Sequence, residues 1–265
     1  MDVDVQSVHS RFSNAGCRRR VVGASTRRGL SLVDVLVSLA VVTILVSLTL
    51  PSFSKVKEHA SRVACRSNVR QVGLGMAMFA DANRDSLPPS VFVTPSNVSK
   101  SQPQETVVLR LSAAESGGAT TNWDGLGVLF RDEYLEPIKI FYCPSYDAEH
   151  DFARYATDFA SMPERVYGNY QYRGQGPNGE TKLTSIVPPR SALISDCLRT
   201  RAEYSHRDGS NVLRADLSLY WYSDAAGTVS ASLPDEAMAG SLVKPIIENA
   251  WKQLDKGNAA LTPTP

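Results

Sequence analysis

Cysteines are the first residues to consider, because thiols bind metals, form disulfides or act as nucleophiles. The chain has four of them, at Cys17, Cys65, Cys143 and Cys197. No two are separated by the two to four residues that join ligands in compact zinc sites. The spacing therefore does not favour a zinc cluster, and we expect no bound metal.

A histidine and several acidic residues gather in a second segment. His206, Asp208 and Asp216 could suggest a metal or acid–base site, and Asp224 is a further carboxylate after them. Their spacing does not match an EF-hand loop, and a hairpin with a polar turn explains them more simply. The sequence also lacks the signatures of a phosphate-binding loop, a nucleophile elbow and a HExxH metalloprotease. We expect neither catalytic residues nor a cofactor, so the chain is predicted not to be an enzyme.

Charge and hydropathy separate the N-terminal part from the rest of the chain. Residues 1–29 carry six arginines against two aspartates, a basic leader of the kind that stays on the cytoplasmic side of a membrane. Residues 30–50 carry a single charge, Asp34, and are otherwise apolar apart from serines and threonines. As a helix they would span about 31 Å, which matches the hydrocarbon core of a bilayer. We therefore predict a transmembrane helix at 30–50.

Other kinds of N-terminal signal fit this segment less well. A secretory signal peptide has an apolar region of about 7–15 residues and a small-residue cleavage site, whereas the run here is longer and ends at Pro51 without such a site. A lipoprotein signal needs an aliphatic residue where Arg62 precedes Cys65. A plain single-pass anchor, with Gly29 as a helix-boundary glycine, stays open.

The junction between leader and apolar run carries a motif. An Arg-Arg-Gly sequence ends at Gly29 and directly precedes Leu30, and Asp34 follows. This arrangement resembles the class III signal of type IV prepilins and type II secretion pseudopilins. The resemblance implies that a prepilin peptidase cuts after Gly29 and methylates Leu30. It also implies that Asp34, where pilins usually carry Glu, pairs with the positive N-terminus of a neighbouring subunit, and that Pro51 kinks the helix.

Later pieces of the chain are similar to one branch of this family, the pilin-like proteins abundant in planctomycete-type bacteria. They are residues 65–73 with 83–89, 141–145, 167–170 and 206–216. The hairpin of that branch normally turns on Asp-Gly, where glycine supplies a positive φ. Here Leu217 follows Asp216, so the turn must be built differently.

The resemblance also bears on the cysteines. Export would bring them into an oxidising compartment, where disulfides persist. Because Cys65 and Cys143 both lie inside motifs shared with the branch, a disulfide between them is favoured, and Cys197 would be left over. The other pairings, and three reduced cysteines that pack as small hydrophobic side chains, stay open.

Hydrophobic periodicity continues beyond residue 50 and predicts a soluble helix at 51–84. Two apolar stripes lie on nearly opposite faces: Phe53, Val56, Ala60 and Val63, then Cys65, Val69, Val72, Met76 and Phe79. We expect the first stripe to face other subunits or lipid headgroups and the second to face the chain's own domain. Gly73 and Gly75 would allow a strand to approach that helix closely.

The fold is predicted to be α+β, with the long N-terminal helix packed on a small antiparallel sheet in a pilin-like domain at 85–252. Strands are predicted at 139–143, 165–173, 192–196, 211–214 and 217–222, and helices at 125–135 and 241–254. Residues 94–121 are predicted to be an inserted loop around a short apolar piece, 107–111, and residues 253–265 a flexible tail.

These features predict a structural subunit of a type IV pilus-like or type II secretion pseudopilus filament. The resemblance implies two partners, the prepilin peptidase/methyltransferase and other pilin-like subunits. It places the chain in the bacterial inner membrane as a single-pass protein with a cytoplasmic N-terminus. Basic residues beyond the leader are scattered among acids, so no nucleic-acid binding is expected. The alternatives are a membrane-anchored binding module that contacts its ligand through 94–121 and, with less support, a tethered enzyme.

Overall fold

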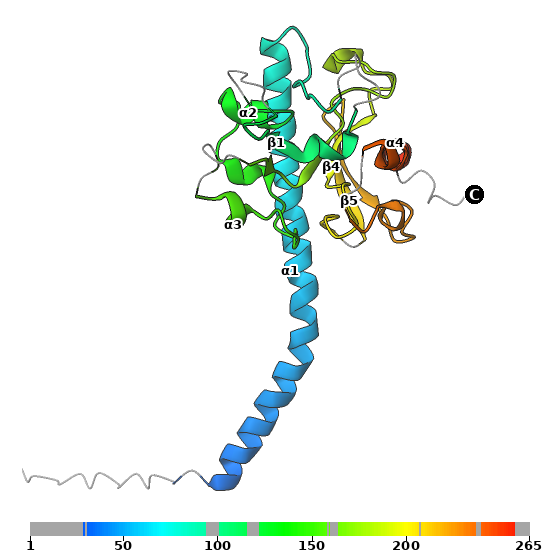
Figure 1. Ribbon diagram of the computed structural model, residues 1–265. Coiled ribbons are helices and arrows are strands. Elements are labelled where there is room, and N and C mark those ends of the chain that lie inside the picture. Colours follow the sequence, from blue (N-terminus) through cyan, green and yellow to red (C-terminus); the bar gives the residue numbers. More distant parts are fainter. Residues whose placement is uncertain are drawn as a thin grey trace, which may run out of the picture. The chain divides into compact units, whose positions relative to one another are not determined.

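The contacts within the chain divide the computed structural model (Figure 1) into two units, Met1–Pro51 and Ser52–Pro265. It describes residues 29, 31–93, 101–115, 122–157, 159, 164–206, 208–236 and 240–257. The side chains of residues 48–52, 54–55 and 240–241 also lie outside the described part. The leader predicted at 1–29 falls outside it as well, apart from Gly29.

Helix α1 (Leu32–Ala82) runs from the first unit into the second. Its N-terminus is closed by local hydrogen bonds, since the Ser31 hydroxyl accepts the N–H of Val33 and Asp34 accepts the N–H of Ser31. The helix ends at Ala82, and shortly after it Arg84 and Asp85 have positive φ angles of 57° and 65° and leave the helical path.

Within the second unit, α1 buries the second predicted stripe. Cys65, Val69, Val72 and Met76 are completely buried, and Phe79 is nearly so. Gly73 has the predicted use, because a Cβ there would meet the Leu213 side chain of strand β5 at 2.7 Å, whereas a Cβ on Gly75 would meet Leu135, which lies outside the strands. The first stripe is exposed at Phe53, Val56 and Val63.

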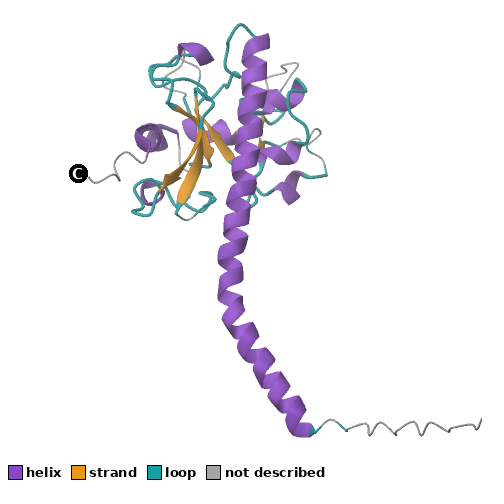
Figure 2. Ribbon diagram, turned by 180° about the vertical axis from the view of Figure 1, so that it is seen from behind, coloured by secondary structure: helices purple, strands orange, loops and turns teal. Residues whose placement is uncertain are grey.

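A four-stranded antiparallel sheet packs on this part of α1, in the order β3 (Tyr170–Tyr172), β4 (Ala192–Asp196), β5 (Gly209–Arg214) and β6 (Leu219–Ser223) (Figure 2). A second, two-stranded sheet pairs β1 (Val108–Arg110) with β2 (Val166–Tyr167). The predicted α+β class and antiparallel pairing are confirmed.

The larger sheet separates two hydrophobic clusters. Neighbouring residues of β5 point to opposite faces, so Leu213 joins the cluster that contains the α1 stripe and Val212 joins the other. That second cluster is closed by α4 (Gly240–Lys256), which contributes Val243, Ile247, Ala250, Trp251 and Leu254. The second unit is therefore layered as α1, sheet and α4 (Figures 1 and 2).

Short helices complete the second unit. They are η2 (Pro103–Val107), α2 (Gly127–Arg131), η3 (Ile138–Phe141), α3 (Phe152–Tyr155), η4 (Leu183–Ser185) and η5 (Ser230–Ser232). The strand predicted at 139–143 is wrong, because η3 occupies its place. Ile140 donates its N–H to Pro137 and Tyr142 donates to Lys139, so these groups bond locally instead of pairing with a strand.

Two segment boundaries also differ from prediction. The described part of 94–121 includes η2 and β1, whose residues Val107, Val108 and Leu109 are buried, so this stretch packs into the domain. At the other end, α4 continues to Lys256 and buries Leu254, so the chain is still helical where a tail was predicted from residue 253. Residues 258–265 lie outside the described part.

Candidate functional site

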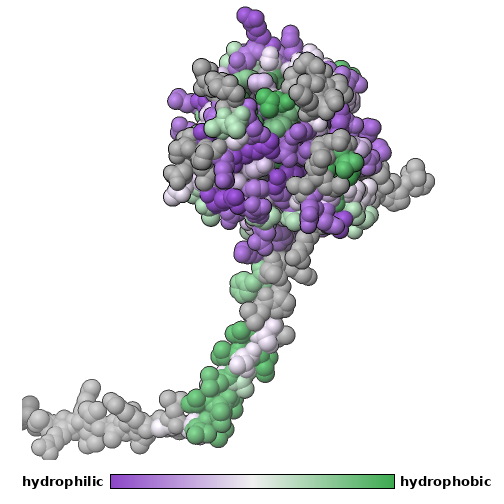
Figure 3. All heavy atoms as spheres, in the orientation of Figure 1, coloured by the Kyte–Doolittle hydropathy of each residue, from purple (hydrophilic) through white to green (hydrophobic). Residues whose placement is uncertain are grey.

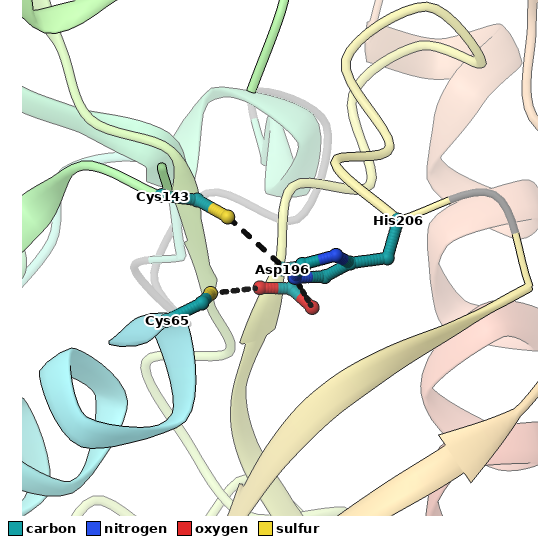
Figure 4. Close-up of side chains that lie close together, drawn as sticks. All are labelled: Cys65, Cys143, Asp196 and His206. Carbon is teal, nitrogen blue, oxygen red and sulfur yellow. Dashed lines mark hydrogen bonds and ion pairs between the residues drawn. The ribbon is translucent and has the colours of Figure 1, made fainter. Parts of the chain in front are cut away.

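Four side chains that could bind or transfer protons meet in the interior of the second unit (Figure 4). Cys65 comes from α1, Cys143 from the turn after η3, Asp196 from the end of β4, and His206 from the loop before β5. All four are buried, and their ligand atoms lie within 4.8 Å of one another. We call these four residues the interior cluster.

Local structure explains why each of these side chains points inward. Cys65 belongs to the buried stripe of α1, and Asp196 ends a strand that is buried along its whole length. The Oδ2 atom of Asp196 accepts the N–H of Asn211 on the adjacent strand β5 at 2.7 Å. Cys143 is held by its own N–H, which donates to the side chain of Asn169 at 3.2 Å.

Contacts within the interior cluster link the groups in a chain that runs from Cys65 through Asp196 and His206 to Cys143. The Cys65 thiol donates to Asp196 Oδ1 at 3.1 Å. The Nε2 atom of His206 lies 3.6 Å from the Cys143 sulfur and 3.9 Å from Asp196 Oδ2. The last of these distances is longer than a normal hydrogen bond, so Nε2 faces both groups without closing tightly on the carboxylate.

A second set of residues orients the ring of His206. Its Nδ1 lies 2.7 Å from Glu58 Oε1, and Glu58 also accepts hydrogen bonds from Arg62 and Ser145. Glu58 and Arg62 lie on the same face of α1 as Cys65, because these residues are separated by four and three positions. The hydroxyl of Tyr170 lies 3.4 Å from the Cys65 sulfur.

The electrostatics of the interior cluster favour charge on some members and oppose it on others. Burial lowers the pKa of His206, but Cys143, Asp196 and Glu58 outweigh burial and raise that pKa to about 9. Burial raises the pKa of Cys143, but hydrogen bonds with Cys65 and His206 outweigh it and lower that pKa to about 7. Burial raises the pKa of Asp196 and raises that of Cys65 well above its ordinary value. These shifts favour a positive charge on His206 and make Cys143 easier to ionise than Cys65.

This arrangement has two chemical capacities. A thiolate beside an imidazolium can act as a nucleophile, and two thiols with an imidazole and a carboxylate can hold a metal ion. The nucleophile needs access to a substrate, whereas all four side chains are buried. The four side chains are therefore placed where they could hold a metal ion, a site that the cysteine spacing did not indicate.

The disulfide predicted between Cys65 and Cys143 is not formed, and both residues are free thiols. The two cysteines are nevertheless close, as members of one cluster. Cys197 is also a free, buried thiol, but it points to a different neighbour, Glu203, at 3.7 Å.

The acidic residues considered with His206 do not join it. Asp208 pairs with Arg62, Asp216 accepts the N–H of Ser218 in a turn, and Asp224 accepts backbone N–H groups of Val229 and Ser230. Within the described residues, the interior cluster is the one group of cysteines, histidines and carboxylates positioned for a metal ion.

The predicted N-terminal site is described in part. Gly29 is exposed, and Asp34 lies in the first turn of α1. Leu30 and the Pro51 side chain lie outside the described residues, although Pro51 is within the bounds of α1.

Across the part of the chain that the structure describes, we find no helix with both the length and the apolar character needed to cross a bilayer. Leu30 and the side chains of residues 48–50 belong to the predicted transmembrane stretch and lie outside that part.

The sequence indicated the two cysteines, but it did not indicate Asp196 or Glu58, and it suggested Asp208 and Asp216 as the neighbours of His206. One sequence feature did point to the site, since Glu58, Arg62 and Cys65 place an acidic, a basic and a thiol side chain on one face of the helix.

Comparisons with known proteins add no assignment: no family model, no curated protein and no solved structure matches this chain.

Proposed function

We propose that the chain is a structural subunit of a type IV pilus-like or type II secretion pseudopilus-like filament, held in a membrane by residues 30–50 before assembly. The observation that carries this proposal is the exposure of α1 in the first unit. All described side chains at 31–47 are exposed, among them Leu32, Leu36 and Ile44, each more than half exposed. Figure 3 shows hydrophobic residues gathered along this part of α1.

A helix that is apolar on every side is stable when lipid or other helices surround it. The polar groups of this stretch are compatible with such surroundings. The hydroxyls of Ser38, Thr43 and Ser47 each donate to a carbonyl one turn earlier, at 2.8 Å. These donors therefore need no water, which removes the main cost of placing them in lipid.

Asp34 supplies the one charge in this stretch. A carboxylate within a membrane helix is costly and indicates a function that provides a partner. Its contact within the described residues is the N–H of Ser31 at 3.2 Å, which leaves the charge without a cation from this helix turn. Cleavage after Gly29 would create a cationic N-terminus, and we propose that Asp34 of one subunit pairs with that N-terminus of the next.

The first experiment determines the intact mass and N-terminal sequence of the protein purified from its native membrane. A chain that begins at N-methylated Leu30 is expected. A chain that keeps residues 1–29 would contradict processing, and would favour a single-pass anchored binding module instead.

A second experiment tests assembly through Asp34. We expect Asp34→Ala to be processed normally but to disappear from the sheared filament fraction, whereas Asp34→Glu retains the carboxylate and assembles. Asp81→Ala is the matched control, because Asp81 is an exposed acid near the other end of α1. Wild-type amounts of Asp34→Ala in filaments would remove the charge pairing from the mechanism.

A further inference from the structure

The interior cluster is unusual as an arrangement of protein groups alone. Its four side chains can carry charge and are fully or almost fully buried together, and such groups are expensive to bury unless an ion or a complete set of hydrogen bonds compensates them. His206 Nε2 lies 3.6 Å from the Cys143 sulfur, an ordinary distance for sulfur, and 3.9 Å from Asp196 Oδ2, which is too far for a hydrogen bond. We propose that Cys65, Cys143, Asp196 and His206 together bind one zinc ion.

Distances in the interior cluster are close to those that zinc requires. Tetrahedral zinc with bonds of about 2.0–2.3 Å places its ligand atoms about 3.3–3.8 Å apart. The separations here are 3.1 Å from the Cys65 sulfur to Asp196 Oδ1, 3.6 Å from the Cys143 sulfur to His206 Nε2, and 3.9 Å from His206 Nε2 to the other carboxylate oxygen, Asp196 Oδ2. No pair exceeds 4.8 Å, so shifts of about one ångström bring all four atoms to bonding distance.

The chemistry of the donor atoms selects the ion. Two sulfurs and an imidazole nitrogen suit zinc, whereas calcium and magnesium take oxygen ligands. Three groups of the site can be anionic, namely the two thiolates and the Asp196 carboxylate. A divalent cation compensates most of that charge and removes the cost of burying it.

The residues around the interior cluster orient the ligands as second neighbours do in zinc sites. Metal-bound histidines commonly donate the other ring N–H to a carboxylate, and here Glu58 accepts from Nδ1 of His206 at 2.7 Å. That bond leaves Nε2, which faces the cluster, as the metal-binding atom. Arg62 and Ser145 hold Glu58 in place, and the N–H of Asn211 holds Asp196.

Four protein ligands in a buried position define a structural site, because catalytic zinc sites keep one position open for water or substrate. The ion would join α1 to the end of β4, to the turn after η3 and to the loop before β5. It would thus cross-link the helix and the sheet in the way that was predicted for a disulfide. The two arrangements exclude each other, because Cys65 and Cys143 cannot bind zinc once they are oxidised to a disulfide.

The test uses the full chain, extracted in detergent under reducing conditions and without chelators. We expect one zinc per chain by mass spectrometry of the metal content. Cys143→Ser should lose that zinc. Cys197→Ser should retain it, and this variant is a matched control because it also removes a buried thiol close to a carboxylate. Equal zinc content in all three proteins, or none in the wild type after zinc is supplied, would overturn the proposal.

A second measurement avoids variants, in case Cys143→Ser fails to fold. The wild-type chain is stripped of metal, and cobalt(II) is added while the absorption spectrum is recorded. A tetrahedral site with thiolates gives intense visible bands and a thiolate-to-cobalt charge-transfer band, which added zinc should abolish. A weak octahedral spectrum would overturn the proposal. So would a native protein that is two hydrogens lighter and yields a peptide with Cys65 linked to Cys143.

Discussion

Helix α1 contains two apolar stretches with opposite surroundings. At 31–47 the described side chains are exposed, whereas at 65–79 the apolar residues Cys65, Val69, Val72 and Met76 are completely buried. This difference in exposure follows from how the apolar residues are arranged around the helix more than from how many there are. The first stretch is apolar on all sides, while the second alternates an apolar stripe with charged and polar residues. A one-sided stripe indicates packing on the chain's own domain, and an all-round apolar surface indicates lipid or other subunits.

Polar groups in the two stretches follow the same division. The hydroxyls at 38, 43 and 47 bond to their own helix. In the packed stretch, by contrast, Asn68 donates to the carbonyl of Tyr142 at 3.0 Å, and Cys65 donates to Asp196. Asn68 and Cys65 therefore bond to the domain, whereas the three hydroxyls of the exposed stretch bond within the helix, as Gln71 of the packed stretch also does through Ser67.

The largest expected effect compares one truncation in each stretch. Met76→Ala removes a completely buried side chain and should lower the free energy of unfolding of the second unit by about 2–5 kcal/mol. Leu39→Ala removes a side chain that is 57% exposed and should change that free energy by less than about 0.5 kcal/mol. Urea denaturation followed by tryptophan fluorescence measures both, because Trp123, Trp221 and Trp251 all lie in the second unit.

Equal losses in the two variants would mean that residues 31–47 also pack on the domain. The comparison between the stretches would then fail. Leu39→Ala should instead affect membrane partitioning and filament incorporation, which are measured separately.

Much of the fold could be predicted where a pattern is local. The buried stripe of α1, the strand at 192–196 and the terminal helix follow from periodicity, and the structure has them with small shifts of the ends. Segments 139–143 and 107–111 have similar apolar content but fold differently. The first forms most of a short helix, and the second contains a strand. Their conformation depends on whether a partner strand is available, which the local sequence does not encode.

The candidate site was harder to predict for a related reason. Its four residues come from separate segments that are brought together only when the helix and the sheet fold. They therefore form no short sequence motif that could be recognised. The proximity of Cys65 and Cys143 could be expected from their shared motifs, but the bond between them could not. Asp196 looked like an ordinary strand end, and its role depends on His206, which lies in a separate loop.

The second prediction concerns how the stability of the second unit depends on pH. The second unit buries several titratable groups, whereas residues 31–47 contain a single titratable side chain, Asp34. His150 is buried, stacks on Tyr167 and shares a hydrogen bond of 2.7 Å with Tyr155. Burial lowers its pKa to about 4, with a further contribution from Arg199. The other charged groups around it are Glu203, Glu149 and Arg154.

In the unfolded chain the pKa of this histidine is about 6.5, so the unfolded state binds more protons than the folded state between pH 6.5 and 4. The stabilising contribution of His150 is complete above pH 6.5 and is lost as the pH falls to 4, by at most about 3 kcal/mol. His150→Gln should therefore flatten the decline of stability in this range. The exposed His59 gives the control, and His59→Gln should keep the wild-type profile. Asp124, whose pKa is raised to about 6 by burial, acts equally in all three proteins.

A His150→Gln variant with the same pH profile as the wild type would contradict this account. The loss of stability of the second unit at low pH would then come from other titratable groups. Denaturation curves at several pH values between 4 and 7 distinguish the two outcomes.

The smallest expected effect concerns the β5–β6 turn, whose end lies beside the packed stretch of α1. Leu217 has a φ of 61°, a left-handed conformation that costs a branched side chain about 1–2 kcal/mol. The turn is held by the N–H of Arg214, which donates to Ser218, and by the Asp216 side chain, which accepts the N–H of Ser218. Glycine adopts this φ without strain but adds entropy to the unfolded chain. We expect Leu217→Gly to raise the free energy of unfolding by about 0.5–1 kcal/mol.

The same substitution at Leu74 should have the opposite sign. Leu74 is 54% exposed on α1, so Leu74→Gly loses little packing, but it places glycine inside a helix at a cost of about 1 kcal/mol. Urea denaturation of the two variants measures the difference. If both variants were destabilised equally, the side chain of Leu217 would contribute more through contact with α1 than it costs in backbone strain. The packed stretch would then extend its contacts to this turn.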